Sequence, residues 1–510
     1  LLPYYIFLTL SDGLSGILAD INQIPSFFII NVWLISRLAS AVMGSLTVFL
    51  VYLIGKEIYN KNVGLISASF LACTMGFVNI SHFATVDVPV TFWTVVSFFF
   101  FIKIINTGKM KYYLLGGLFA GLAASTKYPA LLLILPLFIS HVLSYEQKSS
   151  KNTSLSFSTF VKESFLKLIK IIFQRKILLG AFMMIVGFVL GSPYSVLDIS
   201  TFKKNFISVG SLFQTRSDAG GAFAYIPSWI TRMQNLMNAM GLLLFLICAV
   251  GMIYMIYKLI KKREENQTNK CSILFLSWVI LFGIVIGGWE YTPMRYMMPI
   301  IPFLAIFGGK FMWDMINSGG IRKKIMSVIL CIVLVYSFGY CLTADTMFVH
   351  DSRYAAGEWI ENNIGENSTI EVYVGSTYLP RFPGWVRIIS PPTWSHNKKE
   401  YIDFLESREE RKTDYIVLTS LHYGSSLRNP EVNPPITKYY SDLIYNHTNY
   451  IIVAKFGPPI NESISTPSSQ IIRTIKGHPN PVFVNPTIVI LKRKSYVGGP
   501  QYLVTQKFTK

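Results

Sequence analysis

Residues 81–105 read SHFATVDVPVTFWTVVSFFFFIKII, a short polar opening followed by an almost unbroken apolar run. A transmembrane helix needs about 20 mostly apolar residues, so the segment from Val86 to Ile105 is predicted to span a membrane. Asp87 stands where this helix begins, a place where the helix dipole favours an acid. A charge near membrane depth is costly and marks either a site or a paired structural contact. The spacing alone leaves both interpretations of Asp87 open.

The rest of the chain repeats this apolar pattern. Of its 510 residues, 52% are hydrophobic and only 14% charged, whereas a soluble domain carries about a quarter charged residues. We therefore predict a mainly α, polytopic membrane protein with about ten spans. Besides the opening segment, they are Trp33–Gly55, Val63–Asn79, Tyr112–Thr126, Ala130–Val142, Ile177–Val196, Ala239–Tyr257, Ser272–Trp289, Met297–Trp313 and Ile325–Leu342.

The basic residues predict how the spans are oriented. The formal net charge is +19, and the Lys and Arg residues gather in alternate loops, at 56–61, 103–111, 148–176, 258–263 and 322–324. Basic loops stay on the cytoplasmic side, which explains the charge without a nucleic-acid partner, and we expect none. The opposite loops, with Asp87, Lys127 and Arg295, are then extracytoplasmic, and a cell-membrane location is expected.

The composition changes after about Thr343. Apolar spans stop, a helical pattern starts at Arg353, and strand-like runs follow. We predict a membrane domain over residues 1–343 and an extracytoplasmic α/β domain over residues 344–510. The expected strands are Ile370–Val374, Tyr415–Thr419, Tyr450–Phe456 and Thr487–Leu491.

Ionisable residues at the outer helix ends are the candidate site. Lys127, in the sequence STKYP, either snorkels to the interface or binds a phosphate as a point charge. Arg295 and Tyr296 open the run RYMMPIIP, and Arg binds phosphate in a fork geometry. Arg37 is a further candidate that could equally be an interfacial anchor. His82 is either simply hydrogen-bonded or a ligand or catalytic group beside Asp87.

Four stretches resemble membrane glycosyltransferases of the GT-C superfamily. They are ISRLASAVMGSLTVFLVYLIGK (Ile35–Lys56), SHFATVDVPVTF (Ser81–Phe92), GLAASTKYPALLL (Gly121–Leu133) and RYMMPIIP (Arg295–Pro302). The nearest resemblance is to the protein-mannosyltransferase and aminoarabinose-transferase-like enzymes (glycosyltransferase family 39-like), in an archaeal form. The resemblance covers nearly the whole chain, and its most specific part is the pairing of the second stretch with the third.

The resemblance implies a GT-C-type bundle and an inverting transfer of a hexose or pentose from a polyprenyl- or dolichyl-phosphate donor. The acceptor would be a protein, a glycan or a lipid. Asp87 matches the second of two acidic sites in the family, and His82 lies in the same motif. Lys127, Arg295, Tyr296 and Arg37 would bind the donor phosphate. A divalent metal at Asp87 is left open.

The first acidic site of the family would precede the segment resembled by residues 1–10. We therefore expect the chain to be N-terminally truncated, with the catalytic base upstream. Two alternatives stay open beside a single-sugar transferase. One is a transferase of whole glycans from the same superfamily. The other is a non-catalytic membrane protein whose outer domain binds a partner or a surface glycan. A lipid-linked-sugar transporter fits less well, because the polar residues lie at one face only.

Overall fold

The computed structural model describes residues 32–146, 174–204, 226–261, 266–287, 294–373, 378–391, 398–428, 430, 433–459 and 484–494. These residues form two compact units, one up to residue 341 and one from residue 342 onward. The first unit is entirely helical in its described part, and the second contains a five-stranded sheet. The predicted class, a mainly α membrane protein with a C-terminal α/β region, is confirmed. The predicted boundary at 343 remains a prediction.

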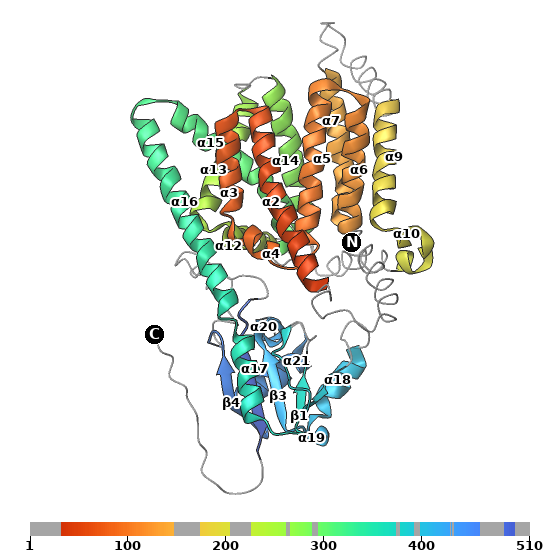
Figure 1. Ribbon diagram of the computed structural model, residues 1–510, viewed down its shortest axis with the longest axis vertical. Helices are drawn as coiled ribbons and strands as arrows, with labels where there is room; N and C mark the ends of the chain where they lie inside the picture. The colour runs from red at the N-terminus through yellow and green to blue at the C-terminus, as the bar shows by residue number, and fades with distance from the viewer. Residues whose placement is uncertain are drawn as a thin grey trace, which may run out of the picture. The chain divides into compact units, whose positions relative to one another are not determined.

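The helices of the first unit follow the apolar runs of the sequence. In their described parts the ten predicted spans fall on helices, and Figure 1 shows α5, α6, α7 and α9 standing side by side. In chain order the elements are α2 (Val32–Ile58), α3 (Lys61–Ala72), α4 (Met75–Ser81), α5 (Asp87–Thr107), α6 (Met110–Thr126), η2 (Tyr128–Leu133), α7 (Ile134–Glu146), α9 (Arg175–Gly191), α10 (Tyr194–Leu197), α12 (Ile226–Met240), α13 (Leu242–Ile260), α14 (Asn266–Gly287), η5 (Met294–Ile300), α15 (Ile301–Asn317) and α16 (Gly320–Val349).

Fewer than ten of these helices are long enough to cross a membrane unaided. Among the described residues, six helices pass by length and apolarity, or seven if α3 and α4 form one broken span. That pair bends by 64°, and Thr74 Oγ1 donates to the Phe70 carbonyl 2.8 Å away at the bend. Hydroxyl groups that bond back to the preceding turn often bend helices. Other predicted spans are shortened by breaks, as at Lys127, where α6 ends.

Close glycine contacts hold α6 against α9. A methyl group on Gly117 would lie 2.0 Å from the Gly180 carbonyl oxygen, and one on Gly121 would lie 2.1 Å from that of Met184. Without side chains at these positions the two backbones approach closely, as small residues allow in membrane bundles. This contact fixes α6, and therefore Lys127 at its end, against the rest of the bundle.

The second unit is a three-layer α/β structure. Its strands run in the spatial order β2 (Arg387–Ile389), β1 (Thr369–Val372), β3 (Tyr415–Thr419), β5 (Ile488–Arg493) and β4 (Tyr450–Phe456). β1 is parallel to β2 and β3, and β5 is antiparallel to β3 and β4. The helices are α17 (Ser352–Asn363), α18 (Lys398–Glu406), α19 (Arg408–Arg411), α20 (Ser420–Arg428) and α21 (Pro434–Ile444).

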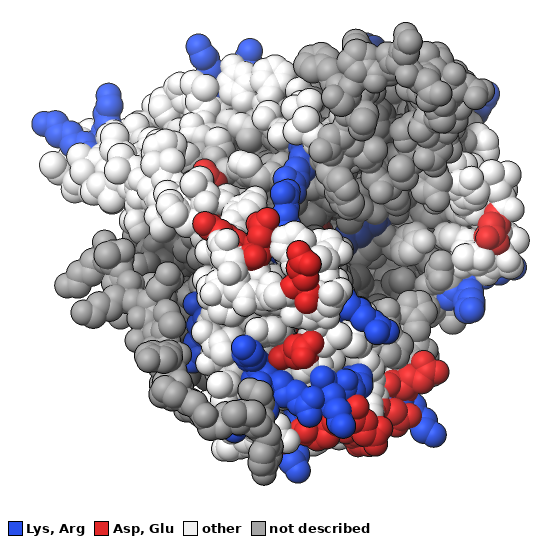
Figure 2. All heavy atoms as spheres, turned by 60° about the horizontal axis from the view of Figure 1, so that its bottom comes forward, with Lys and Arg blue, Asp and Glu red and all other residues white. Residues whose placement is uncertain are grey.

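Alternation along the strands divides the core between the two faces of the sheet. Val417 packs in one cluster with Ile360 of α17, whereas Leu418 packs in the other with Tyr401 of α18 and Leu443 of α21. Successive side chains of a strand point to opposite faces, so a helix layer covers each side. Figure 2 shows acidic and basic side chains interspersed over this unit, which faces the viewer there, rather than a field of one sign.

Candidate functional site

Asp87 occupies the first turn of α5 and is only 2% exposed. The chain enters the helix at Val86, and Pro89 follows in the first turn, where a missing backbone N–H costs nothing. Thr91 Oγ1 donates to the Asp87 carbonyl over 2.7 Å, which ties the side chain of the next turn to this one. The helix dipole favours a carboxylate here, but a buried charge also needs a partner.

Lys127 provides that partner. It is the extended residue between α6 and η2, just before Tyr128 and Pro129, so the helix stops and the side chain turns toward α5. Lys127 Nζ lies 2.6 Å from Asp87 Oδ1, and the two side chains are 18% and 3% exposed. Because α5 and α6 run antiparallel through Gly108, the start of one helix and the end of the other lie together.

Arg295 and Tyr296 complete the cluster from η5. Arg295 Nε lies 3.7 Å from Asp87 Oδ2, and Lys127 Nζ stands 3.5 Å from the centre of the Tyr296 ring. The Arg295 guanidinium carbon is 5.8 Å from the same ring. Both cations therefore share one carboxylate and one aromatic face, an arrangement in which cation–π attraction adds to the ion pairs.

Two cations of this cluster, Lys127 and Arg295, face the one carboxylate of Asp87. In a partly buried setting the effective dielectric is low, so these charges act strongly on one another and on nearby groups. The arrangement suits an anion that approaches Lys127 and Arg295 from the side away from Asp87. Of the predicted site residues, the structure brings four together: Asp87, Lys127, Arg295 and Tyr296.

His82 and Arg37 are placed differently. His82 is exposed and ends α4, with Nδ1 2.9 Å from the Val78 carbonyl oxygen of the same helix. Arg37 is exposed near the start of α2, next to Leu38, which is 61% exposed. The hydrogen bond of His82 is to its own helix, and the ion pairs of Asp87 are with Lys127 and Arg295 rather than with Arg37. Their catalytic and phosphate-binding roles remain predictions.

The donor set of the cluster does not fit a divalent metal. Among the residues that the structure describes, no three of His, Cys, Asp and Glu converge on one point. The oxygens of Asp87 already face Lys127 and Arg295. A metal ion would have to displace Lys127 and would then sit among like charges, so no chemical step at this cluster is assigned to one.

Two further charge networks, one partly buried and one buried, were not predicted from the sequence. In the first unit, Asp314 of α15 lies 2.6 Å from Lys258 and 2.8 Å from Lys310. In the second, Glu371 of β1 is fully buried and accepts from Arg411 Nη2 at 2.6 Å and Nε at 3.0 Å. Only the i, i+4 spacing of Lys310 and Asp314 was visible in the sequence, because the other partners are distant along the chain.

Tyrosines surround Glu371. The hydroxyls of Tyr373 and Tyr439 contact each other and the Glu371 carboxylate. Burial, followed by the neighbouring tyrosine and carboxylate, raises the pKa of Tyr373 well above its usual value. Burial and the Glu371 charge likewise raise the pKa of Tyr439. The network lies inside the core of the second unit and is structural.

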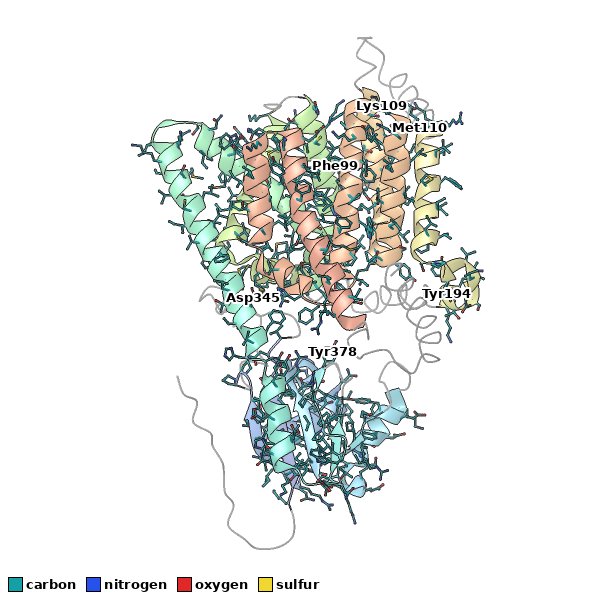
Figure 3. All side chains as sticks on the ribbon, in the orientation of Figure 1. Phe99, Lys109, Met110, Tyr194, Asp345 and Tyr378 are labelled. Carbon is teal, nitrogen blue, oxygen red and sulfur yellow. The ribbon has the colours of Figure 1, made fainter. Side chains whose placement is uncertain are left out.

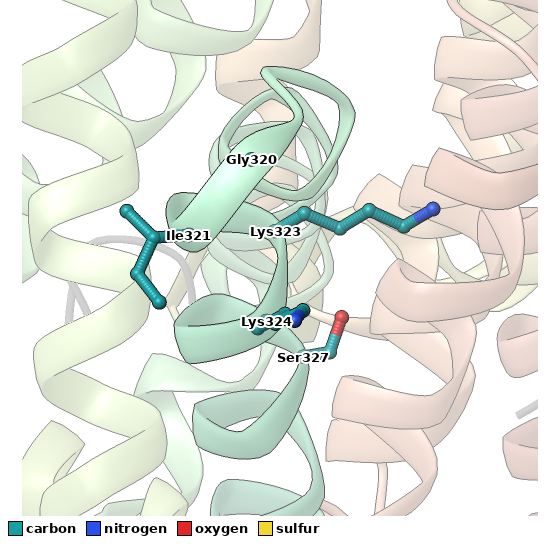
Figure 4. Close-up of a pocket in the computed structure, with 5 residues that line it drawn as sticks. All are labelled: Gly320, Ile321, Lys323, Lys324 and Ser327. Atoms are coloured by element: carbon teal, nitrogen blue, oxygen red, sulfur yellow. The ribbon is translucent and has the colours of Figure 1, made fainter.

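A hollow of about 720 Å³ lies at the start of α16. Figure 4 draws the residues that line it, Gly320, Ile321, Lys323, Lys324 and Ser327. Its lining comes from one helix end, and Ile321 and Lys323 point to opposite sides.

Lys109 and Met110, at the start of α6, and Tyr194, in α10, mark the two ends of the bundle in Figure 3. α6 therefore starts at the end away from Tyr194, and its last residues, next to Lys127, lie toward the Tyr194 end.

Comparison with known families agrees with the resemblance. The family model described as dolichyl-phosphate-mannose-protein mannosyltransferase matches residues 29–161, less than half of the chain. The match contains Asp87 and Lys127 and confirms the resemblance to GT-C glycosyltransferases over that segment. No curated protein sequence matches the chain.

Solved structures with partial similarity were also found. ArnT from Cupriavidus metallidurans bound to undecaprenyl phosphate shares 13% identity over 91% of this chain and 85% of that chain, with a TM-score of 0.46. The oligosaccharyltransferase AglB from Archaeoglobus fulgidus, in complex with an inhibitory peptide and a dolichol-phosphate, shares 14% identity over 96% of this chain and 80% of that chain, with a TM-score of 0.43. A structure of the oligosaccharyltransferase from the same organism with Zn and sulfate shares 12% identity over 96% and 80%, with a TM-score of 0.42.

Proposed function

We propose that this protein is a glycosyltransferase that moves a sugar from a polyprenyl- or dolichyl-phosphate donor to an acceptor on the extracytoplasmic side of the cell membrane. The observation that carries the proposal is the ion cluster of Asp87, Lys127 and Arg295. Two of its residues lie in the segment that matches the mannosyltransferase family model. The cluster brings two cations, Lys127 and Arg295, to one place, as a site for a lipid phosphate requires.

The reaction forms one bond and breaks one. An acceptor oxygen attacks the anomeric carbon of the sugar from the face opposite the phosphate, so the configuration inverts. The bond between that carbon and the phosphate oxygen breaks, and the lipid phosphate leaves with the electron pair. The acceptor proton passes to a carboxylate base outside this cluster. Such a transition state resembles an oxocarbenium ion, with charge growing on the departing phosphate.

Each residue of the cluster has a distinct part in this step. Lys127 and Arg295 face the developing charge on the phosphate, and preorganised cations of this kind lower the barrier. Tyr296 supports both cations with its ring and has a hydroxyl to offer the phosphate. Asp87 is buried and paired, so we assign it to holding the two cations in place. It keeps them from repelling each other before the donor binds.

The test is the release of lipid phosphate. Full-length protein in lipid vesicles would be incubated with radiolabelled dolichyl-phosphate mannose or undecaprenyl-phosphate aminoarabinose and with membrane acceptor fractions. We expect acceptor-dependent release of lipid phosphate, which falls strongly in Lys127→Ala. Lys323→Ala is the matched control, because it removes the same charge from the start of α16. If the wild-type protein releases no lipid phosphate, or if both variants behave alike, the proposal is wrong.

A further inference from the structure

A polar pocket on the second unit has no role in the transfer described above. Its volume is about 390 Å³, within the range of pockets that bind small molecules. One wall is a single face of α17 and the other is the chain at 381–383. The lining residues are Arg353, Tyr354, Gly357, Glu358, Glu361, Arg381, Phe382 and Pro383.

The wall on α17 is held in a fixed position. Asp351 caps the helix by accepting from the Arg353 backbone N–H at 2.9 Å. The same carboxylate receives Arg353 Nε at 2.9 Å and Nη2 at 2.6 Å. A fork of two parallel bonds sets the plane of a guanidinium as well as its position. Asp351 also accepts from the Asn485 backbone N–H at 3.2 Å, which ties the helix start to the chain before β5.

The facing wall lies in van der Waals contact with α17. A methyl group on Gly357 would meet the Arg381 backbone oxygen at 3.4 Å and nitrogen at 3.5 Å. Phe382 packs on the core cluster that contains Ile360 of α17. The segment that carries Arg381 and Phe382 is therefore seated against the helix by backbone and core contacts, and the pocket lies between two supported walls.

The chemistry of the lining selects the kind of ligand. The lining carries two arginines and two glutamates, and Asp351, which is bonded to Arg353, brings the formal charge of the group to −1. A phosphate would meet this negative charge, and among the described residues no three of His, Cys, Asp and Glu converge to hold a metal ion, so neither is favoured. A neutral ligand with many hydroxyl groups can accept from the arginines and donate to the glutamates at the same time.

Tyr354 adds an exposed aromatic ring to the hydrogen-bonding groups of the pocket. Tyr354 is 66% exposed and stands on the pocket wall. An aromatic face exposed beside hydrogen-bonding groups offers an apolar platform to one side of a flat ligand. The C–H-rich face of a pyranose ring fits this platform while its hydroxyls reach the charged groups. A peptide would find its backbone partners at a strand edge instead, as at β2.

We propose that this pocket is a saccharide-binding subsite that takes one neutral hexose of a glycan. The choice of a sugar agrees with the proposed function, but the binding itself needs no donor lipid and no transfer. The subsite would hold a surface or acceptor glycan on the second unit.

The experiment is saturation-transfer NMR on the full-length protein in lipid nanodiscs, free of glycoside detergents. The probes are methyl α-mannopyranoside and methyl α-glucopyranoside, with a synthetic Ser/Thr-rich peptide as the alternative ligand. We expect a signal from at least one glycoside, with binding weakened about tenfold or more in Tyr354→Ala and in Glu358→Gln. Tyr445→Ala is the matched control, since Tyr445 is 54% exposed on the same unit, outside the pocket.

The outcomes distinguish a saccharide subsite from a peptide site, and both from a failure of the proposed function. Absence of signal from both glycosides overturns the subsite, and so does an unchanged signal in Tyr354→Ala and Glu358→Gln. Binding of the peptide alone, lost in the same variants, would replace the saccharide by a peptide and also overturn it. A Lys127→Ala variant must keep the glycoside signal. If glycosides bind but no lipid phosphate is ever released, the proposed function fails while the subsite stands.

Discussion

Asp87 Oδ1 lies 2.6 Å from Lys127 Nζ, across 40 residues of sequence, and joins the first turn of α5 to the residue that ends α6. This pair is nearly closed to solvent on the Asp87 side, with the carboxylate 3% exposed. Its strength therefore depends on both partners, because a buried charge left alone costs far more than the pair gains. The same pair also places Lys127 beside Arg295, whose Nε lies 3.7 Å from the other oxygen of Asp87.

Asp87→Asn tests this pairing. The amide keeps the shape of the side chain but removes its charge, so Lys127 and Arg295 would repel each other. We expect a loss of about 3–5 kcal/mol in stability, the range for breaking a buried pair, together with weaker use of the lipid donor. Thermal unfolding in nanodiscs and the lipid-phosphate assay provide the two readouts. The double variant Asp87→Asn/Lys127→Met should recover stability but not transfer. Normal stability and normal transfer in Asp87→Asn would remove the residue from the site.

Arg295→Lys tests the guanidinium rather than the charge. Lysine keeps the positive charge but not the planar fork, so one contact to the phosphate is lost. A hydrogen bond to a charged group contributes about 1.5–3 kcal/mol, which corresponds to an increase of about 10- to 150-fold in the KM for the donor. The increase should be absent in the matched variant Arg322→Lys at the start of α16. Equal donor saturation in both variants would place Arg295 outside the phosphate site.

Much of the fold could be predicted from the sequence because its signals are local. The apolar runs predict the helices, and the run from Tyr415 to Thr419 coincides with β3. The edge strand β2 (Arg387–Ile389) was not predicted, since three residues with an exposed pattern carry no usable alternation. Fewer unbroken spans than predicted are found among the described residues, because breaks such as the one at Thr74 depend on hydrogen bonds that composition does not reveal.

The candidate site was predictable in part for a different reason. Asp87, Lys127 and Arg295 are ionisable residues at helix ends within apolar sequence, and such residues are rare enough to be noticed. Their pairing could not be predicted, because it depends on α5 and α6 folding back on each other. Glu371 and Arg411 gave no signal at all, since charged residues in a domain of average composition are usually exposed.

Gly121→Ala should separate α6 from α9. The new methyl would lie 2.1 Å from the Met184 carbonyl oxygen and 2.7 Å from the Phe188 nitrogen, both of them backbone atoms that cannot rotate away. Overpacking of this kind costs about 1–3 kcal/mol or more, so the midpoint of thermal unfolding should fall. Gly339→Ala is the control, because nothing lies within 4 Å of the added methyl on α16. A helix gains about 0.5–1 kcal/mol from that exchange. Equal effects of both variants would contradict the close contact.

Glu371→Gln should destabilise the second unit through its ion pair. Arg411 makes two hydrogen bonds to the carboxylate, and Glu371 is fully buried. Replacing it by the amide leaves the guanidinium without a compensating charge, at a cost of about 3–5 kcal/mol. Hydrogen exchange over β1 and β3 would show the loss. Glu366→Gln, at an exposed position of the same unit, should leave exchange unchanged. Protection that survives in Glu371→Gln would mean that the tyrosines alone hold this core.

Alkaline pH should unfold the second unit through its buried tyrosines. Burial, with the nearby carboxylate, raises the pKa values of Tyr373 and Tyr439 in the folded state, whereas an unfolded tyrosine has a pKa of about 10. The folded state therefore binds these protons more tightly. The stability they contribute is complete below about pH 10 and is lost as the pH rises toward the folded-state values.

Tyrosinate absorbance of the full-length protein should show a late fraction that titrates together with the loss of amide protection over β3. Tyr373→Phe should shrink that fraction. Titration of all tyrosines near pH 10 with the fold intact would contradict the network around Glu371.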